Sequence, residues 1–151
     1  MSYPKVYALG HRYLAELFLD EVVIQEKVDG SQLSFGVKSG AVWCKSKGAE
    51  IDVNSPPKLF APAVAHILSI KDSLIEGWNY RGEAITKPKH NTLTYSRTPA
   101  GFVALFDIDD GNENYIEPLK VAVAANRSGM ESVPLLGRMR VEKLEQLAGF
   151  L

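Results

Sequence analysis

The sequence predicts an α+β fold in which antiparallel strands are covered by helices. Short runs of β-type residues are separated by the turn dipeptides Asp29-Gly30 and Ser39-Gly40. Two later segments, 61–75 and 117–126, carry apolar residues at helical spacing. With 151 residues and 46% hydrophobic content, the chain is long enough to bury one core. We therefore expect a single domain over residues 1–151.

The first third of the chain predicts a helix followed by strands. Residues 11–19 carry four apolar side chains at helical spacing: Tyr13, Leu14, Leu17 and Phe18. We expect a short helix there, with this apolar face in the core. Strands are predicted at 22–28, 33–38 and 41–46, and the two turn dipeptides would connect them as an antiparallel meander.

The rest of the chain alternates helices and strands. The helix over 61–75 carries Pro62, which is tolerated in a first turn. Strands over 78–85 and 101–108 are separated by a long polar loop, and polar loops of that length are often functional. We expect that loop at 86–99, then a helix at 117–126, a strand at 132–136 and a helix at 141–150.

Composition excludes several classes of protein. The net charge of −1 gives no overall attraction to nucleic acid, so any such binding must come from local patches. A single cysteine, Cys44, excludes an intrachain disulfide framework and fits a reducing compartment. No apolar run reaches about 18 residues, and the N-terminus lacks a secretory pattern. We expect a cytoplasmic protein, in the host cytoplasm if it is phage-encoded, with no membrane partner.

The segment EKVDGSQ places Lys27 two residues before Asp29-Gly30. A lysine is a nucleophile only when neutral, and its ordinary pKa of about 10.4 makes that dependent on its surroundings. Gly30 would let a ligand come close to the backbone. The alternative is an ordinary hairpin turn, which a KxDG segment alone indicates more often.

Other side chains are candidates for binding a nucleotide. Lys45 and Lys47 lie at a strand end and could meet phosphate oxygens, although the pattern also fits a solvated basic strand end. Glu83 could accept from a ribose hydroxyl or hold a metal-bound water, and Phe106 could stack on a purine. The alternatives are a surface carboxylate for Glu83 and a core ring for Phe106.

Taken together, these segments resemble a known superfamily. The segments KVDG (27–30), CKSKG (44–48), YRGEAI (80–85) and FVALFDI (102–108) follow the order and rough spacing of motifs I, Ia, III and IIIa of the covalent nucleotidyltransferases. Those enzymes include DNA ligases, RNA ligases and mRNA capping enzymes. The loop KPKHN-x-L-x-Y-x-R-x-P makes residues 82–108 similar to ATP-dependent RNA ligase domains, and the resemblance extends over nearly the whole chain. It implies a ligase-type adenylyltransferase fold, which is ATP-grasp-like.

The resemblance implies a three-step reaction. Lys27 would attack the α-phosphate of ATP to form lysyl-AMP, and the AMP would pass to a 5′-phosphate RNA end. A 3′-hydroxyl would then attack with release of AMP, in RNA repair. The implied cofactors are ATP and Mg²⁺ or Mn²⁺, with unknown metal ligands, and the partners are RNA ends. The alternatives are an inactive nucleotide- or RNA-binding domain, or a relative of DNA ligases or capping guanylyltransferases, against which the loop argues.

Residue roles follow by position in the motifs. Glu26 would lie beside adenine, Gln32 near the phosphate or ribose, and Glu83 at the ribose or metal. Lys45 replaces the arginine that is usual in motif Ia, with Lys47 as second choice, and Phe106 would stack on adenine. The implied nucleotide-binding residues are Glu26, Asp29, Gly30, Gln32, Lys45, Glu83 and Phe106. The implied RNA-binding residues are Lys47, Lys87, Lys89, His90, Asn91 and Arg97. We expect Lys27, Glu83 and Phe106 to converge on one site.

The family pattern continues with EG-x-V and KxK motifs, which supply a carboxylate and two cations. Residue 151 falls in the helix expected to precede them. We therefore expect a C-terminally incomplete domain, carrying motifs I to IIIa, that forms little adenylate by itself. A fragment, a split-gene product and a degenerate relative all fit. An unpaired sheet edge is expected, which self-association or a second chain would cover.

Overall fold

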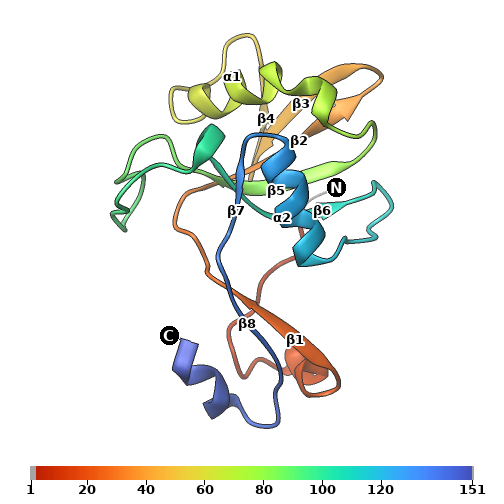
Figure 1. Cartoon of the computed structure of the whole chain (residues 1–151), viewed down its shortest axis with the longest axis vertical. Helices are drawn as coiled ribbons and strands as arrows, with labels where there is room; N and C mark the ends of the chain where they lie inside the picture. Colours follow the sequence, from red (N-terminus) through yellow and green to blue (C-terminus); the bar gives the residue numbers. More distant parts are fainter. Residues whose placement is uncertain (1–2, 151) are drawn as a thin grey trace. The chain divides into compact units, whose positions relative to one another are not determined.

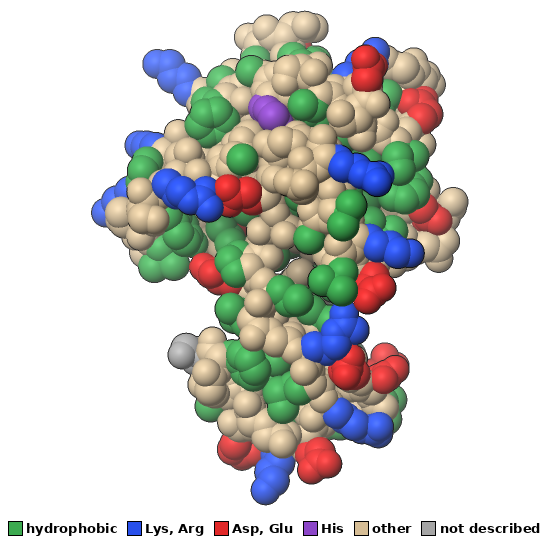
Figure 2. Space-filling model, in the orientation of Figure 1, with side chains coloured by type: hydrophobic (Ala, Val, Ile, Leu, Met, Phe, Trp, Pro, Cys, Tyr) green, Lys and Arg blue, Asp and Glu red, His purple; other side chains and the backbone are tan. Residues whose placement is uncertain are grey.

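A computed structural model describes residues 3–150 of the chain. The chain forms two compact units (Figure 1). The central unit is Lys27–Val133, and the terminal unit joins residues up to 26 with residues from 134 onward. Charged side chains of both signs are interspersed over the face of the molecule that Figure 2 presents.

A six-stranded sheet forms the centre of the central unit, in the order β4-β3-β2-β5-β6-β7. All neighbouring strands are antiparallel except the edge pair β6 and β7, which is parallel. The strands are β2 (Ser31–Lys38), β3 (Ala41–Ser46), β4 (Glu50–Ile51), β5 (Asn79–Ala84), β6 (Val103–Asp109) and β7 (Glu131–Ser132). The predicted α+β class is confirmed, and the parallel pair is an addition to it.

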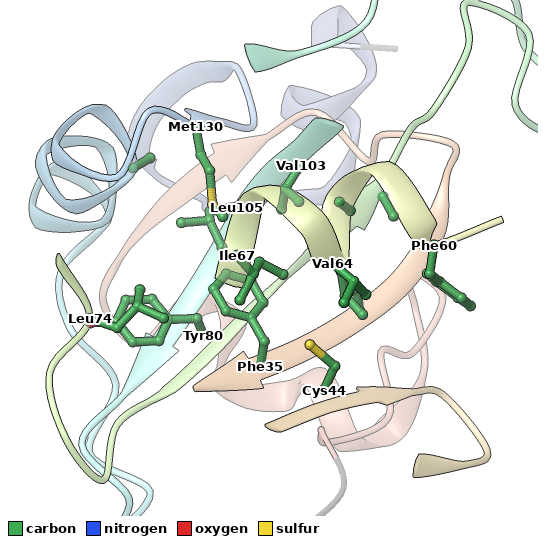
Figure 3. Close-up of a cluster of buried hydrophobic side chains, with 14 of the residues drawn as sticks. Phe35, Cys44, Phe60, Val64, Ile67, Leu74, Tyr80, Val103, Leu105 and Met130 are labelled. Carbon is green, nitrogen blue, oxygen red and sulfur yellow. The ribbon is translucent and has the colours of Figure 1, made fainter. Parts of the chain in front are cut away.

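One face of this sheet packs on two helices. In β2 the alternate residues Leu33, Phe35 and Val37 are buried, as a strand with one covered face requires. They share a core cluster with buried residues of α1 (Ala61–Ser69) and α2 (Pro118–Arg127) (Figure 3). Cys44 lies in this core, and burial raises the pKa of its thiol to about 12. Cys44 is therefore an inert packing residue.

The other face of the sheet is polar. Directly opposed residues of antiparallel strands point to the same side, and Gln32 opposes Glu83 while Ser34 opposes both Arg81 and Lys45. This face therefore carries most of the side chains that the sequence marked for nucleotide binding. At its β6 end, Phe106 packs on a second apolar cluster, formed by Val28, Ile85, Ala104 and Val133 with Tyr95.

The main differences between predicted and observed boundaries in this unit concern α1 and β6. The helix predicted over 61–75 ends at Ser69 and is followed by a 3-10 turn, Lys71–Ser73. The strand predicted from 101 begins at Val103, because Gly101 has φ +66° within a short 3-10 turn. Between β5 and this turn, residues 86–99 form the predicted long loop without helix or strand.

The terminal unit contains a two-stranded sheet. Here β1 (Glu21–Gln25) pairs antiparallel with β8 (Leu135–Arg140). The predicted meander is therefore wrong for its first strand, and Asp29-Gly30 is not a hairpin turn. The physical reason is that a partner more than 100 residues away satisfies β1, whereas the polar groups of Asp29 bond to the 86–99 loop.

The ends of the chain also differ from the sequence prediction. Residues Arg12–Phe18 form a 3-10 helix without a buried residue, so the expected core face is wrong. The predicted strand at 132–136 is replaced by β7 and β8. The predicted last helix is a 3-10 helix, Leu144–Phe150, which buries Leu147. Over residues 3–150, no helix has the length and apolarity needed to cross a membrane.

Candidate functional site

Lys27 and Glu83 lie close enough in the central unit for their charges to interact. Lys27 is exposed, and Glu83 on β5 is half-buried. Burial, with a smaller contribution from the charge of Asp29, raises the pKa of Glu83 to about 7. Lys27 and the N–H of Gly30 oppose that rise by stabilising the carboxylate. An exposed lysine beside a half-buried carboxylate makes this region the candidate site.

Gly30 fixes the approach of the Lys27 segment to β5. A Cβ at position 30 would lie 2.6 Å from the carbonyl oxygen of Ala84 and 2.9 Å from Cγ1 of Ile85. Only glycine therefore fits without a shift of the β5 backbone. The sequence indicated room for a ligand at Gly30, but in the structure β5 itself occupies that space. The same contact lets the Gly30 N–H donate to the Glu83 carboxylate.

Asp29 fastens the 86–99 loop to the Lys27 segment. Its carboxylate accepts from Asn91 Nδ2 at 2.9 Å and from the backbone N–H groups of Thr92 and Leu93 at 2.8 and 2.7 Å. The Leu93 bond is the largest cause of a lowered pKa of Asp29. In return, the Asp29 N–H donates to Tyr95 Oη at 2.8 Å. We call this set of four hydrogen bonds the Asp29 clasp.

Two further contacts hold the same loop. His90 Nδ1 accepts from the Thr86 N–H at 3.1 Å, which leaves Nε2 to carry the proton and donate to Ser31 Oγ at 2.9 Å. Arg97 forms a bidentate ion pair with Glu131, at 2.7 and 3.1 Å. The long loop is therefore fixed near its start, its middle and its end.

These bonds separate the predicted RNA-binding residues into two groups. The polar groups of His90, Asn91 and Arg97 bond within the chain, so their observed contacts hold the loop. Lys47, Lys87 and Lys89 are exposed and make no hydrogen bond or ion pair within residues 3–150. Those three lysines remain available for an external phosphate.

The remaining predicted residues lie at different distances from this centre. Gln32 stands directly opposite Glu83, and Lys45 is two strands away from Glu83 on the same face. Phe106 shares the second apolar cluster with Val28, the neighbour of Lys27. Glu26 belongs to the terminal unit, where its N–H donates to the Pro134 carbonyl at 2.9 Å.

Sequence reasoning missed Tyr95 and the backbone donors of Thr92 and Leu93. Tyr95 was visible in the loop pattern, but no sequence signal indicates that it bonds to a residue 66 positions away.

Residues 3–150 bring together no group of three or more His, Cys, Asp or Glu side chains placed to hold a metal ion.

One of the comparisons with known proteins identifies a family. The family model described as RNA ligase matches residues 20–150. No curated protein sequence matches the chain.

Solved structures share this fold at low sequence identity. The RNA ligase of Naegleria gruberi with ATP and Mn superposes with a TM-score of 0.66 at 17% identity, over 91% of this chain and 42% of that one. The same enzyme with PPi gives 0.65 at 16% identity, over 91% and 42%. An archaeal ATP-dependent RNA ligase gives 0.68 at 16% identity, over 99% and 40%. The chain thus spans about two fifths of the length of these structures.

Proposed function

The chain belongs to the RNA ligase family, and from this premise we propose that it is an ATP-dependent adenylyltransferase of the RNA ligase type. The observation that carries the proposal is the placement of exposed Lys27 beside Glu83, with Gly30 bonded to the same carboxylate. This placement supports Lys27 as the nucleophile, because the two residues are 56 positions apart in sequence and lie in different elements.

The proposed step forms one bond and breaks another. Neutral Lys27 Nζ attacks the α-phosphorus of ATP, a P–N bond forms, and the bond to the pyrophosphate oxygen breaks. Nζ loses its proton and pyrophosphate leaves with the electron pair. Charged Glu83 can accept a ribose hydroxyl, and its pKa of about 7 means that this state is present in part at neutral pH.

The chain's own contacts support a positioning role for the residues around Lys27. The Asp29 clasp and the interaction of the Gly30 N–H with Glu83 hold the residues on the C-terminal side of Lys27. A nucleophile held in one place avoids part of the entropic cost of reaching the phosphorus. His90, Asn91 and Tyr95 therefore act as positioning residues in this proposal.

Nucleotide and RNA would be held by the polar face of the sheet and by the free lysines. Phe106 offers a ring for adenine, and Gln32 and Lys45 offer polar contacts to the ribose and phosphates. Mg²⁺ or Mn²⁺ would arrive with ATP, coordinated chiefly by phosphate oxygens. Lys47, Lys87 and Lys89 would contact the backbone of an RNA end, onto whose 5′-phosphate the AMP passes before a 3′-hydroxyl attacks. A cytoplasmic setting in RNA repair suits this reaction.

Amide NMR spectra of the isotope-labelled chain test the nucleotide site. Titration with ATP should shift the amide signals of Gly30, Glu83 and Phe106 and leave those of β4 unchanged. GTP should cause smaller shifts, since the proposal assigns an adenine contact to Phe106. Unchanged signals at Gly30 and Glu83 with saturating ATP would refute the proposed nucleotide site.

A further inference from the structure

An exposed cluster of aromatic rings lies near the start of the chain, in the terminal unit. Tyr7 stacks on His11 with 4.5 Å between ring centroids. Tyr13 completes the cluster, with its centroid 5.3 Å from Tyr7 and 5.0 Å from His11. Tyr13 keeps 60% of its surface exposed, so these rings are not a buried core.

Two cations are attached to the same rings. Lys5 Nζ lies 5.2 Å from the Tyr7 centroid, and Arg12 Cζ lies 4.9 Å from the Tyr13 centroid. The Arg12 guanidinium also donates to Tyr13 Oη at 3.0 Å. Residues 3–15 contain no aspartate or glutamate, so this stretch is positive within a chain whose net charge is −1.

One contact in the cluster is structural, since His11 Nδ1 accepts from the Tyr13 N–H at 3.2 Å and caps the 3-10 helix, but burial does not account for the rings. The 3-10 helix that carries Arg12 and Tyr13 buries no residue, and the neighbouring Val6 and Leu9 are 74% and 51% exposed. Flat rings interleaved with cations match the chemistry of a single-stranded nucleic acid, whose bases stack on rings while its phosphates meet cations.

We propose that Lys5, Tyr7, His11, Arg12 and Tyr13 form a binding surface for single-stranded RNA, which we call the ring surface. The choice of RNA as the ligand rests on the proposed function. In this proposal the exposed ring of Tyr13, 60% of whose surface is open, stacks on a base, and Lys5 and Arg12 contact the adjoining phosphates. The ring surface is a second RNA contact, built from different residues than Lys47, Lys87 and Lys89.

Fluorescence anisotropy with a fluorescein-labelled oligouridylate that carries a 5′-phosphate tests the ring surface on the 151-residue chain. Tyr13→Ala and Tyr13→Leu should each weaken binding by about fivefold or more, because both lose the flat face. Tyr13→Phe keeps that face and should bind within about twofold of the wild type. Thermal melting should show that all three variants remain folded, as expected for an exposed side chain.

Salt dependence tests the phosphate contacts. Lys5→Ala should lower the slope of log affinity against log salt by about 0.7, the value for one phosphate contact on a single strand. Lys120→Ala removes an exposed lysine of α2 and should leave both the affinity and the slope unchanged. Tyr13→Ala should reduce the affinity with the slope unchanged.

Two outcomes would overturn the proposal: no measurable RNA binding by the wild-type chain, or equal affinity of Tyr13→Ala and wild type. The second would show that the Tyr13 ring contributes nothing to RNA binding. The ATP titration separates this result from the proposed function. Tyr13-dependent RNA binding without ATP-induced shifts keeps the ring surface and removes the adenylyltransferase. ATP-induced shifts together with RNA binding that does not depend on Tyr13 keep the adenylyltransferase and remove the ring surface.

Discussion

Replacing Tyr95 by phenylalanine removes one hydroxyl group and tests whether the Asp29 clasp positions the Lys27 segment. Tyr95 Oη accepts the Asp29 N–H at 2.8 Å, two residues after Lys27. The ring packs on the second apolar cluster with Val28 and Ile85, and phenylalanine can keep those contacts. Tyr95→Phe therefore leaves a partly buried amide without its acceptor and changes little else.

The structure sets the size of the effect. An unpaired buried donor costs about 1–3 kcal/mol, and partial exposure of this site favours the lower end, about 1 kcal/mol. Tyr95→Ala also loses the packing of a half-buried ring, which adds about 2 kcal/mol. Less precise placement of Lys27 in Tyr95→Phe, if it raises the activation free energy by the same 1 kcal/mol, would slow adenylate formation about fivefold.

Native-state hydrogen exchange gives the most local readout. The Asp29 amide should exchange faster in Tyr95→Phe, while amides in the middle of β2 keep their protection. Tyr13→Phe is the matched control, since its hydroxyl is exposed and bonds only to Arg12 among the contacts of residues 3–150. Equal exchange of the Asp29 amide in Tyr95→Phe and wild type would refute the clasp as a positioning device.

Three further predictions concern single residues. Gly30→Ala should destabilise the chain by about 1–3 kcal/mol in urea unfolding, because its Cβ would overlap the Ala84 carbonyl. Gly48→Ala, where nothing lies within 4 Å and φ is not positive, should change stability by about 0.5 kcal/mol or less, and an equal cost at both sites would contradict this account. In the wild type, the free energy of unfolding should fall as pH rises from about 4.5 to 7, because folded Glu83 holds a proton there that the unfolded chain has released. Glu83→Gln should remove this fall, which is on the order of 1–2 kcal/mol after screening. An unchanged pH profile of unfolding would count against the raised pKa. Cys44 should resist alkylation at pH 8 in the folded chain and react in urea, because burial raises its pKa to about 12; rapid alkylation of the folded chain would show that the core opens.

Local patterns predicted the sheet and helices of the central unit well. The alternation in residues 33–38 and the Ser39-Gly40 turn identify the β2–β3 hairpin, because both signals lie within a few residues of the pairing they describe. The pairing of β1 with β8 was not predictable in this way. Its partners are separated by more than 100 residues, and an apolar run such as EVVIQ fits many neighbours equally.

The sequence predicted which residues lie near one another, whereas their roles in binding and catalysis stay predictions. The order of the motifs placed Lys27, Gln32 and Glu83 together, and the structure brings these residues to one region. The polar loop at 86–99 was predicted to contact RNA, whereas Asn91 and His90 bond to Asp29 and Ser31. Polar residues in a loop indicate hydrogen bonding, but the sequence does not say whether the partner is a ligand or the chain itself.

Mapping the adenylated residue tests the central claim most directly. Radiolabelled ATP with Mg²⁺ or Mn²⁺ would be added to the 151-residue chain and to the same chain extended through EG-x-V and KxK motifs. Peptide mass analysis would then locate the covalent AMP. We predict a single AMP on Lys27 in the extended chain, its removal by pyrophosphate, no label in Lys27→Ala, and weaker label in Glu83→Ala. A folded extended chain that takes no label, or that carries it on another lysine, would contradict the account.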